Sequence, residues 1–200
     1  RGYMTVTLLK TARIVDGSAT EPTDPMGIVI EDGMIREVGA GAHAEADEVL
    51  DLDGLTVMPG LIDCHVHVIA TTANLGLNAA LPDSLIAARS SLLMRNMIMR
   101  GFTTVRDPGG GDVGLSLAVE AGLINGPRFL FGGKALSQTG GHCDMRPADE
   151  ELPCGCTYSG TICQVVDGAD EVRKVCRDEL RKGADHIQLF ISGGVASPTD

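Results

Sequence analysis

The sequence predicts an α/β protein, in which part of a small β-sandwich over residues 1–60 precedes the N-terminal half of a (β/α)8 TIM barrel, strands 1–4, over residues 61–200. Short β runs separated by turn residues fill the first part. After Pro59 and Gly60, strands alternate with helices, which is typical of βα units and a parallel sheet. A complete eight-stranded barrel usually needs about 250 residues, so the second part has the length of half a barrel.

Two Asp-Gly pairs organise the N-terminal β runs. Asp32-Gly33 lies between residues 28–30 and 34–38, and Asp53-Gly54 lies between residues 48–52 and 55–58. Asp-Gly supplies the positive φ angles that a tight hairpin turn needs. The sequence therefore predicts two hairpins in an antiparallel sheet.

The second part has a regular order of apolar runs and breakers, with an irregular Gly-, Cys- and Pro-rich stretch over residues 133–165. Amphipathic runs that end near glycines predict the helices, and short apolar runs predict the strands. The expected strands are 61–68, 103–107, 128–131 and 186–191, and the expected helices are 84–100, 113–121 and 169–182.

Charge and composition exclude several classes of function. The chain carries 16 Lys+Arg against 27 Asp+Glu, a net charge of −11, which disfavours contact with nucleic acid or an anionic membrane. Aromatic residues make up 3% of the chain and Trp is absent, so stacking platforms for bases are not expected. No apolar run reaches the ~18 residues of a membrane helix. We expect a small-molecule partner, with no nucleic acid and no membrane.

Cysteine usage and the N-terminus favour a cytoplasmic protein. Six cysteines in a chain of this length suit a reducing compartment better than a disulfide scaffold. Cys154, Cys156 and Cys163 do not have the paired spacing of a structural zinc site, so free thiols are expected, with a disulfide as the less favoured alternative. No signal-peptide pattern is visible, and the residues before Met4 are interpreted as an expression remnant.

The strongest candidate site lies in the expected strand 61–68. Residues two apart share one face of a strand, so Asp63, His65 and His67 should face one side and Cys64 the other, toward the core. Two neighbouring imidazoles at the carboxyl end of a barrel strand suit a divalent metal, and Asp63 could anchor one of them. The alternative is a pair of surface or hydrogen-bonded histidines.

Four motifs resemble one superfamily. The run VMPGLIDCHVHV at 57–68 resembles the first barrel strand of amidohydrolases. GFTTVRDPGG (101–110), GKALSQTGGH (133–142) and GADHIQLFISGGVASPTD (183–200) narrow the resemblance to the prolidase-like and carboxypeptidase-like branch, close to imidazolonepropionases and ochratoxin-hydrolysing amidohydrolases. The resemblance implies a (β/α)8 barrel with a β-sandwich, one or two zinc ions, hydrolysis of amide bonds, homo-oligomers, and His65 and His67 as metal ligands.

The same resemblance assigns further residues. His142 becomes a substrate-contacting residue, with Arg146 as a partner for a substrate carboxylate; an ordinary loop histidine is the alternative. Gln188 occupies the position of a carboxylated lysine that bridges two metals in this branch. A glutamine amide cannot take up CO2, so Gln188 is a doubtful ligand. The family's other ligands, including the general-base aspartate, are expected beyond residue 200, which indicates the N-terminal half of a longer protein or a truncated product.

These observations predict a metal-dependent amidohydrolase that cleaves dipeptides or N-acyl amino acids through metal-activated water. Gln188 and the missing ligands motivate a different hypothesis, a catalytically impaired relative that acts as a scaffold. A cyclic-amide hydrolase of the imidazolone type is a third interpretation.

Overall fold

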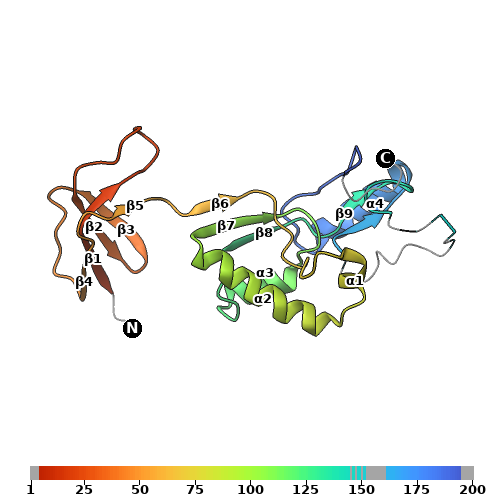
Figure 1. Cartoon of the computed structure of the whole chain (residues 1–200), viewed down its shortest axis with the longest axis horizontal. Coiled ribbons are helices and arrows are strands. Elements are labelled where there is room, and N and C mark those ends of the chain that lie inside the picture. The colour runs from red at the N-terminus through yellow and green to blue at the C-terminus, as the bar shows by residue number, and fades with distance from the viewer. Residues whose placement is uncertain (1–4, 145, 147, 150, 152–160, 195–200) are drawn as a thin grey trace. The chain divides into compact units, whose positions relative to one another are not determined.

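The structure is a computed structural model that describes residues 5–144, 146, 148–149, 151 and 161–194. The chain divides into two compact units, Arg1–Pro59 and Gly60–Asp200 (Figure 1). Cys154 and Cys156 lie outside the described residues. Among the helices in the described ranges, none is both long and apolar enough to cross a membrane.

The first unit is a mixed β-sheet built around its first strand. The sheet has the order β3-β2-β1-β4, and β5 also pairs with β1. β2 pairs antiparallel with β1 and with β3, whereas β4 and β5 run parallel to β1. The strands are β1 (Val6–Ile14), β2 (Met26–Glu31), β3 (Met34–Gly39), β4 (Glu48–Asp51) and β5 (Thr56–Val57).

The first predicted hairpin is confirmed and the second is wrong. Asp32 and Gly33 have φ angles of 51° and 77° and join the antiparallel strands β2 and β3. The second Asp-Gly pair also has positive φ, yet the strands on either side of it both pair with β1. The reason is a bulge in β1 at Thr11, whose carbonyl and hydroxyl oxygens accept hydrogen bonds from Gly54 N (2.9 Å) and Asp53 N (3.0 Å). The Asp53-Gly54 turn therefore packs against the bulge, and β4 and β5 both run parallel to β1 without forming a hairpin.

The second unit contains a parallel three-stranded sheet, β6-β7-β8, with α2 and α3 on one face (Figure 1). The apolar core lies between the sheet and these helices, where Met94 of α2 and Val105 of β7 are both 0% exposed. The elements are β6 (Leu61–Asp63), α1 (Leu75–Ala79), α2 (Asp83–Met99), β7 (Phe102–Asp107), α3 (Val113–Glu120), β8 (Arg128–Phe131), β9 (Ala135–Ser137), β10 (Cys163–Val165) and α4 (Gly168–Arg181).

Four details differ from the sequence-based expectations. The strand expected over 61–68 ends at Asp63, so Cys64 is exposed and does not pack in the core. Residues 133–165 contain the parallel pair β9–β10. In the range 186–191, regular pairing is limited to one bridge, between Leu189 and Leu136. The short helix α1, which no pattern predicted, is capped by the side chain of Asn74.

Candidate functional site

His65 and His67 lie in the turn that follows β6, at the carboxyl end of the strand. Their ring centroids are 5.2 Å apart and the ring planes are at 84°. His65 is exposed and His67 is half-buried. The structure thus brings the two predicted imidazoles side by side, although they are carried by a turn and not by the strand itself.

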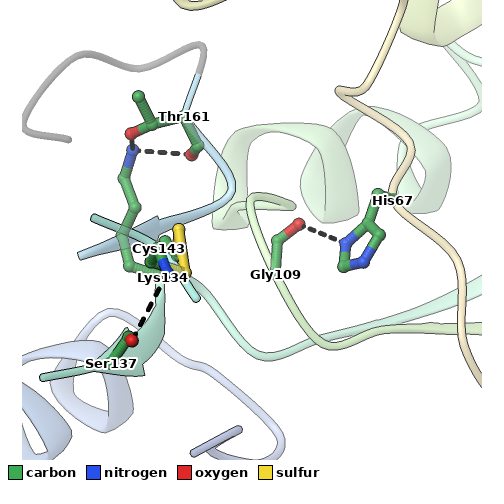
Figure 2. The surroundings of a disulfide bond; sticks show 7 residues. His67, Gly109, Lys134, Ser137, Cys143 and Thr161 are labelled. Carbon is green, nitrogen blue, oxygen red and sulfur yellow. Dashed lines mark hydrogen bonds between the residues drawn. A yellow bond between two sulfur atoms is a disulfide. The ribbon is translucent and has the colours of Figure 1, made fainter. Parts of the chain in front are cut away.

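His67 is held in one orientation by the main chain of the next loop. Its Nδ1 lies 2.9 Å from the carbonyl oxygen of Gly109, as Figure 2 shows. Because a carbonyl can only accept, Nδ1 is the donor, and in the neutral ring this tautomer leaves the lone pair on Nε2. This arrangement, with one ring nitrogen donating to a carbonyl, is the one that metal-binding histidines commonly adopt.

The carboxylate of Asp107 holds the turn that carries His65 and His67. Asp107 ends β7, is 0% exposed, and its carboxylate accepts hydrogen bonds from the backbone amides of Val68 (2.7 Å), Gly109 (2.9 Å) and Gly111 (3.3 Å). Burial raises the pKa of Asp107 to about 6, against the opposing effect of these hydrogen bonds and of nearby His65. The carboxylate therefore links the His65–His67 turn to the glycine loop that orients His67.

Sequence reasoning did not find this role of Asp107 and Gly109. The available signal was an aspartate at a strand end followed by Pro108 and three glycines. Side chains are excluded there because a Cβ on Gly109 would lie 2.7 Å from the carbonyl oxygen of Ile162, and one on Gly111 would lie 2.5 Å from the Phe129 ring. Such a loop brings its amides and carbonyls close to neighbouring groups.

Asp63 contacts the histidine turn with its carboxylate, whereas Gln188 contacts β9 through its backbone. The Asp63 carboxylate accepts a hydrogen bond of 3.0 Å from the backbone amide of His65, so it shapes the turn. Its role toward an imidazole stays a prediction. The half-buried Gln188 accepts at its backbone oxygen from Leu136 N (2.9 Å), which places residues 186–190 beside β9. Within the described ranges, no group of three His, Cys, Asp or Glu side chains is arranged to hold a metal ion.

His186 is a half-buried residue whose ring nitrogen Nε2 is buried, and no motif singled it out. Its Nε2 has no hydrogen-bond partner among the residues with described positions. Burial lowers the pKa of His186, and the positive charge of Arg106 lowers it further. Gly132 gives the ring its space, because a Cβ there would lie 2.9 Å from Nε2. The only available signal was its place two residues before Gln188.

The loop after β9 carries the other two predicted site residues. The His142 ring packs on the Phe190 ring, with centroids 4.7 Å apart. Arg146 forms a two-pronged pair with Asp144, Nε to Oδ1 at 2.7 Å and NH2 to Oδ2 at 2.6 Å. This pairing holds the pKa of the Asp144 carboxyl well below its usual range. The guanidinium expected to meet a substrate carboxylate is therefore paired with a carboxylate of the protein.

A disulfide between Cys143 and Cys163 closes this loop, with a Cα–Cα distance of 6.0 Å. The expectation of a free thiol at Cys163 is therefore wrong. The pairing of β9 with β10 places Cys163 opposite Ala135, and Cys143 packs in the same apolar cluster, a long-range proximity that residue spacing does not reveal. The Cys143 amide also donates to the Ser137 hydroxyl at 3.4 Å (Figure 2). Disulfides persist in oxidising compartments, which weighs against the predicted cytoplasmic location.

With this geometry established, the chain can be compared with known proteins. The Amidohydrolase family matches residues 56–199, well over half of the sequence. The ochratoxinase of Aspergillus niger is 31% identical over 216 residues, which cover 98% of this chain and 44% of that protein. The chain therefore belongs to the amidohydrolase family, whose members resembling it are hydrolytic enzymes.

Solved structures agree with this assignment. A prolidase complexed with N-methylphosphonate-L-proline is 48% identical, with a TM-score of 0.92, covering 98% of this chain and 49% of the other. A Xaa-Pro dipeptidase with bound methionine is 28% identical, with a TM-score of 0.78, covering 96% and 48%. The chain thus spans about half the length of these relatives.

Proposed function

We propose that this chain supplies the N-terminal part of a metal-dependent amidohydrolase that hydrolyses the peptide or amide bond of dipeptides or N-acyl amino acids. The main observation in support is the pair of adjacent imidazoles after β6, in which the Gly109 carbonyl orients His67 through Nδ1. The similarity to a prolidase complexed with N-methylphosphonate-L-proline supports the substrate class.

In this proposal the two units have separate roles. Residues 1–60 form part of a small β-sandwich, and residues 61–200 form strands 1–4 of a (β/α)8 TIM barrel. The parallel order β6-β7-β8, with residues 186–190 beside β9, supports this assignment. The glycine loop and the two histidines then lie at the carboxyl ends of the strands, where barrel enzymes place their active sites. Assembly into homo-oligomers remains a prediction.

The histidines fit a divalent metal as two of its ligands. Nε2 of His67 is available because Nδ1 is held, and the neighbouring His65 ring is exposed. A catalytic zinc usually has three protein ligands, so His65 and His67 do not complete the set. Gln188 is a doubtful oxygen ligand. We assign the remaining metal ligands to residues of a longer protein. Amidohydrolases generally bind divalent metals, and zinc, as one or two ions, is the proposed cofactor.

Each residue then has a stated task. A bound divalent ion lowers the pKa of a water molecule and polarises the scissile carbonyl. Asp107 and Gly109 keep the His65–His67 turn and the His67 ring in place. His142 contacts the substrate, and Arg146 binds its carboxylate by exchanging the bond to Asp144. The general base is an aspartate outside this chain.

Zinc titration calorimetry and elemental analysis test the metal site. Wild-type chain should bind Zn²⁺, and His67→Asn should weaken binding at least tenfold because a ligand is lost. His43→Asn is the matched control, since His43 is an exposed histidine of the other unit. Equal zinc affinity in all three proteins would remove the basis of the proposal.

Activity is tested with Xaa-Pro dipeptides, N-acyl amino acids and cyclic amides, with and without a chelator. We expect chelator-sensitive release of proline from the Xaa-Pro dipeptides. Preferential opening of cyclic amides would favour the imidazolone-type alternative.

A second candidate, a catalytically impaired scaffold, is favoured by the amide at Gln188. Gln188→Lys with bicarbonate separates the two functions. If the variant gains metal and turnover while the wild type has neither, Gln188 accounts for the impairment. Zinc-dependent turnover by the wild type would exclude the scaffold.

A further inference from the structure

A cavity of about 320 Å³ lies between α2 and α3, and neither of the paired histidines lines it, although Ile69 and Gly110 of the neighbouring loops do. Its volume is in the usual range for small-molecule sites. Most of its wall is apolar, with Ser90 as an internal hydroxyl and two aspartates at the helix starts. The lining residues used below are Ile86, Ala87, Leu115 and Ala118 on the wall, Ser90 inside, and Asp83 with Asp112.

The polar residues of α2 and α3 are not spread evenly around the cavity. On α2, Asp83, Ile86 and Ser90 recur at helical spacing along one face, and seven residues at 1.5 Å each separate Asp83 from Ser90 by about 10 Å. On α3, Asp112 is the N-cap and Leu115 follows along the same wall. One end of the cavity therefore carries two carboxylates, and the hydroxyl lies about two turns further along α2.

The hydroxyl of Ser90 is the buried polar group of this cavity that has no hydrogen-bond partner in the described part of the chain. Ser90 itself is 0% exposed. A serine inside a helix usually bonds to the carbonyl four residues earlier or points to solvent. A buried hydroxyl without a partner is unfavourable, so a ligand that offers a hydrogen bond there gains from it.

We propose that this cavity binds a small uncharged aromatic molecule that carries one hydroxyl group. The ring packs on Ile86, Leu115 and Ala118, and the ligand hydroxyl exchanges a hydrogen bond with Ser90 Oγ. Asp112, the N-cap of α3, places a carboxylate at the other end of the cavity and disfavours an anion there. The site is independent of any metal, so its test does not depend on the proposed hydrolase activity.

Three probes of similar size test the proposal on the whole chain: benzyl alcohol, toluene and benzoate. Binding is followed by ligand-observed NMR titration. We expect benzyl alcohol to bind about five- to tenfold more tightly than toluene because of the Ser90 hydrogen bond, and benzoate to bind most weakly. Equal binding of all three, or no saturable binding of benzyl alcohol at millimolar concentration, would overturn the proposal.

Variants locate the binding. Ser90→Ala should lower the affinity for benzyl alcohol to that for toluene and leave toluene binding unchanged. Ala118→Phe should fill the cavity and abolish both, and Ala87→Phe provides the same test from the opposite helix. Circular dichroism confirms that each variant is folded, and at least one filled variant must fold for the comparison. Benzyl alcohol binding that survives in a folded filled variant would place the site elsewhere and refute the assignment.

Discussion

The two loops that carry the predicted site residues are held in different ways. The turn after β6 is held by backbone groups and by the buried carboxylate of Asp107, which receives three amide hydrogen bonds. The loop after β9 is held by the Cys143–Cys163 disulfide and by the ion pair of Asp144 with Arg146. The first arrangement suits a fixed pair of ligands. The second makes the conformation around His142 depend on oxidation state and acidity.

Asp107→Ala should produce the largest loss of stability. The change leaves the buried amides of Val68, Gly109 and Gly111 without their acceptor, so we expect the free energy of unfolding to fall by about 4 kcal/mol. Urea denaturation measures the change. Asp112→Ala is the control, because this exposed N-cap aspartate should cost only about 1 kcal/mol. Equal losses would mean that Asp107 is no special support for the turn.

Removing the disulfide should have the next largest effect. The cysteines are 20 residues apart, and cross-linking a loop of this length stabilises by about 3 kcal/mol. The double variant Cys143→Ser/Cys163→Ser should lose this amount in urea denaturation without reductant. Dithiothreitol should shift the wild type to the same midpoint and leave the variant unchanged. Cys64→Ser, at an exposed free cysteine, should stay within about 0.5 kcal/mol of wild type.

Local patterns in the sequence were sufficient for the three longer helices, α2, α3 and α4, and for the strands β6, β7 and β8 that alternate with them. The helix predicted over 84–100 is observed at Asp83–Met99, and that over 169–182 at Gly168–Arg181, each within one residue. The short strands were harder, because β9 and β10 are stabilised by pairing with each other across 25 intervening residues. The second Asp-Gly turn shows the same limit, since its outcome depends on the bulge at Thr11.

The sequence predicted which residues lie in the candidate site but not which groups they bond to. The adjacency of His65 and His67 follows from their spacing, and the structure places their rings together. The hydrogen bond from His67 to Gly109 joins residues 42 apart in the chain, and the pairing of Arg146 with Asp144 depends on which carboxylate a loop brings near. Spacing identifies residues of suitable chemistry, whereas the tertiary fold selects their partners.

Arg146→Leu tests whether the ion pair with Asp144 makes the stability of the loop after β9 depend on pH. The guanidinium lowers the pKa of the buried Asp144, so the pair stabilises the folded state above the ordinary carboxyl pKa of about 3.9, and this stabilisation is lost as pH falls through the lowered folded value. The variant should lose about 2 kcal/mol at pH 7, and less as the pH falls below 4. Urea denaturation at pH 7, 4 and 3 measures this. Arg173→Leu, which breaks the exposed pair with Asp170, should change stability by at most about 0.5 kcal/mol. A loss at pH 7 no greater than in this control would show that Arg146 does not anchor the loop.

Lys134 tests the same region at high pH. Its Nζ donates to the backbone oxygen of Thr161 at 2.8 Å, beside the disulfide (Figure 2), and burial lowers its pKa to about 8 despite the attraction of Glu179. The unfolded pKa is about 10.4, so the folded state disfavours the charged amine below pH 8, and stability rises between pH 8 and 10.4 as the folded amine loses its proton first. Wild type should therefore gain about 1 kcal/mol relative to Lys134→Met between pH 7 and 10 in urea denaturation, a value reduced for partial exposure. Lys174→Met, at an exposed lysine of α4, should show no such change. If the difference between wild type and Lys134→Met is the same at both pH values, the ammonium group is not destabilised by burial, and the loop after β9 depends on pH only through its ion pair.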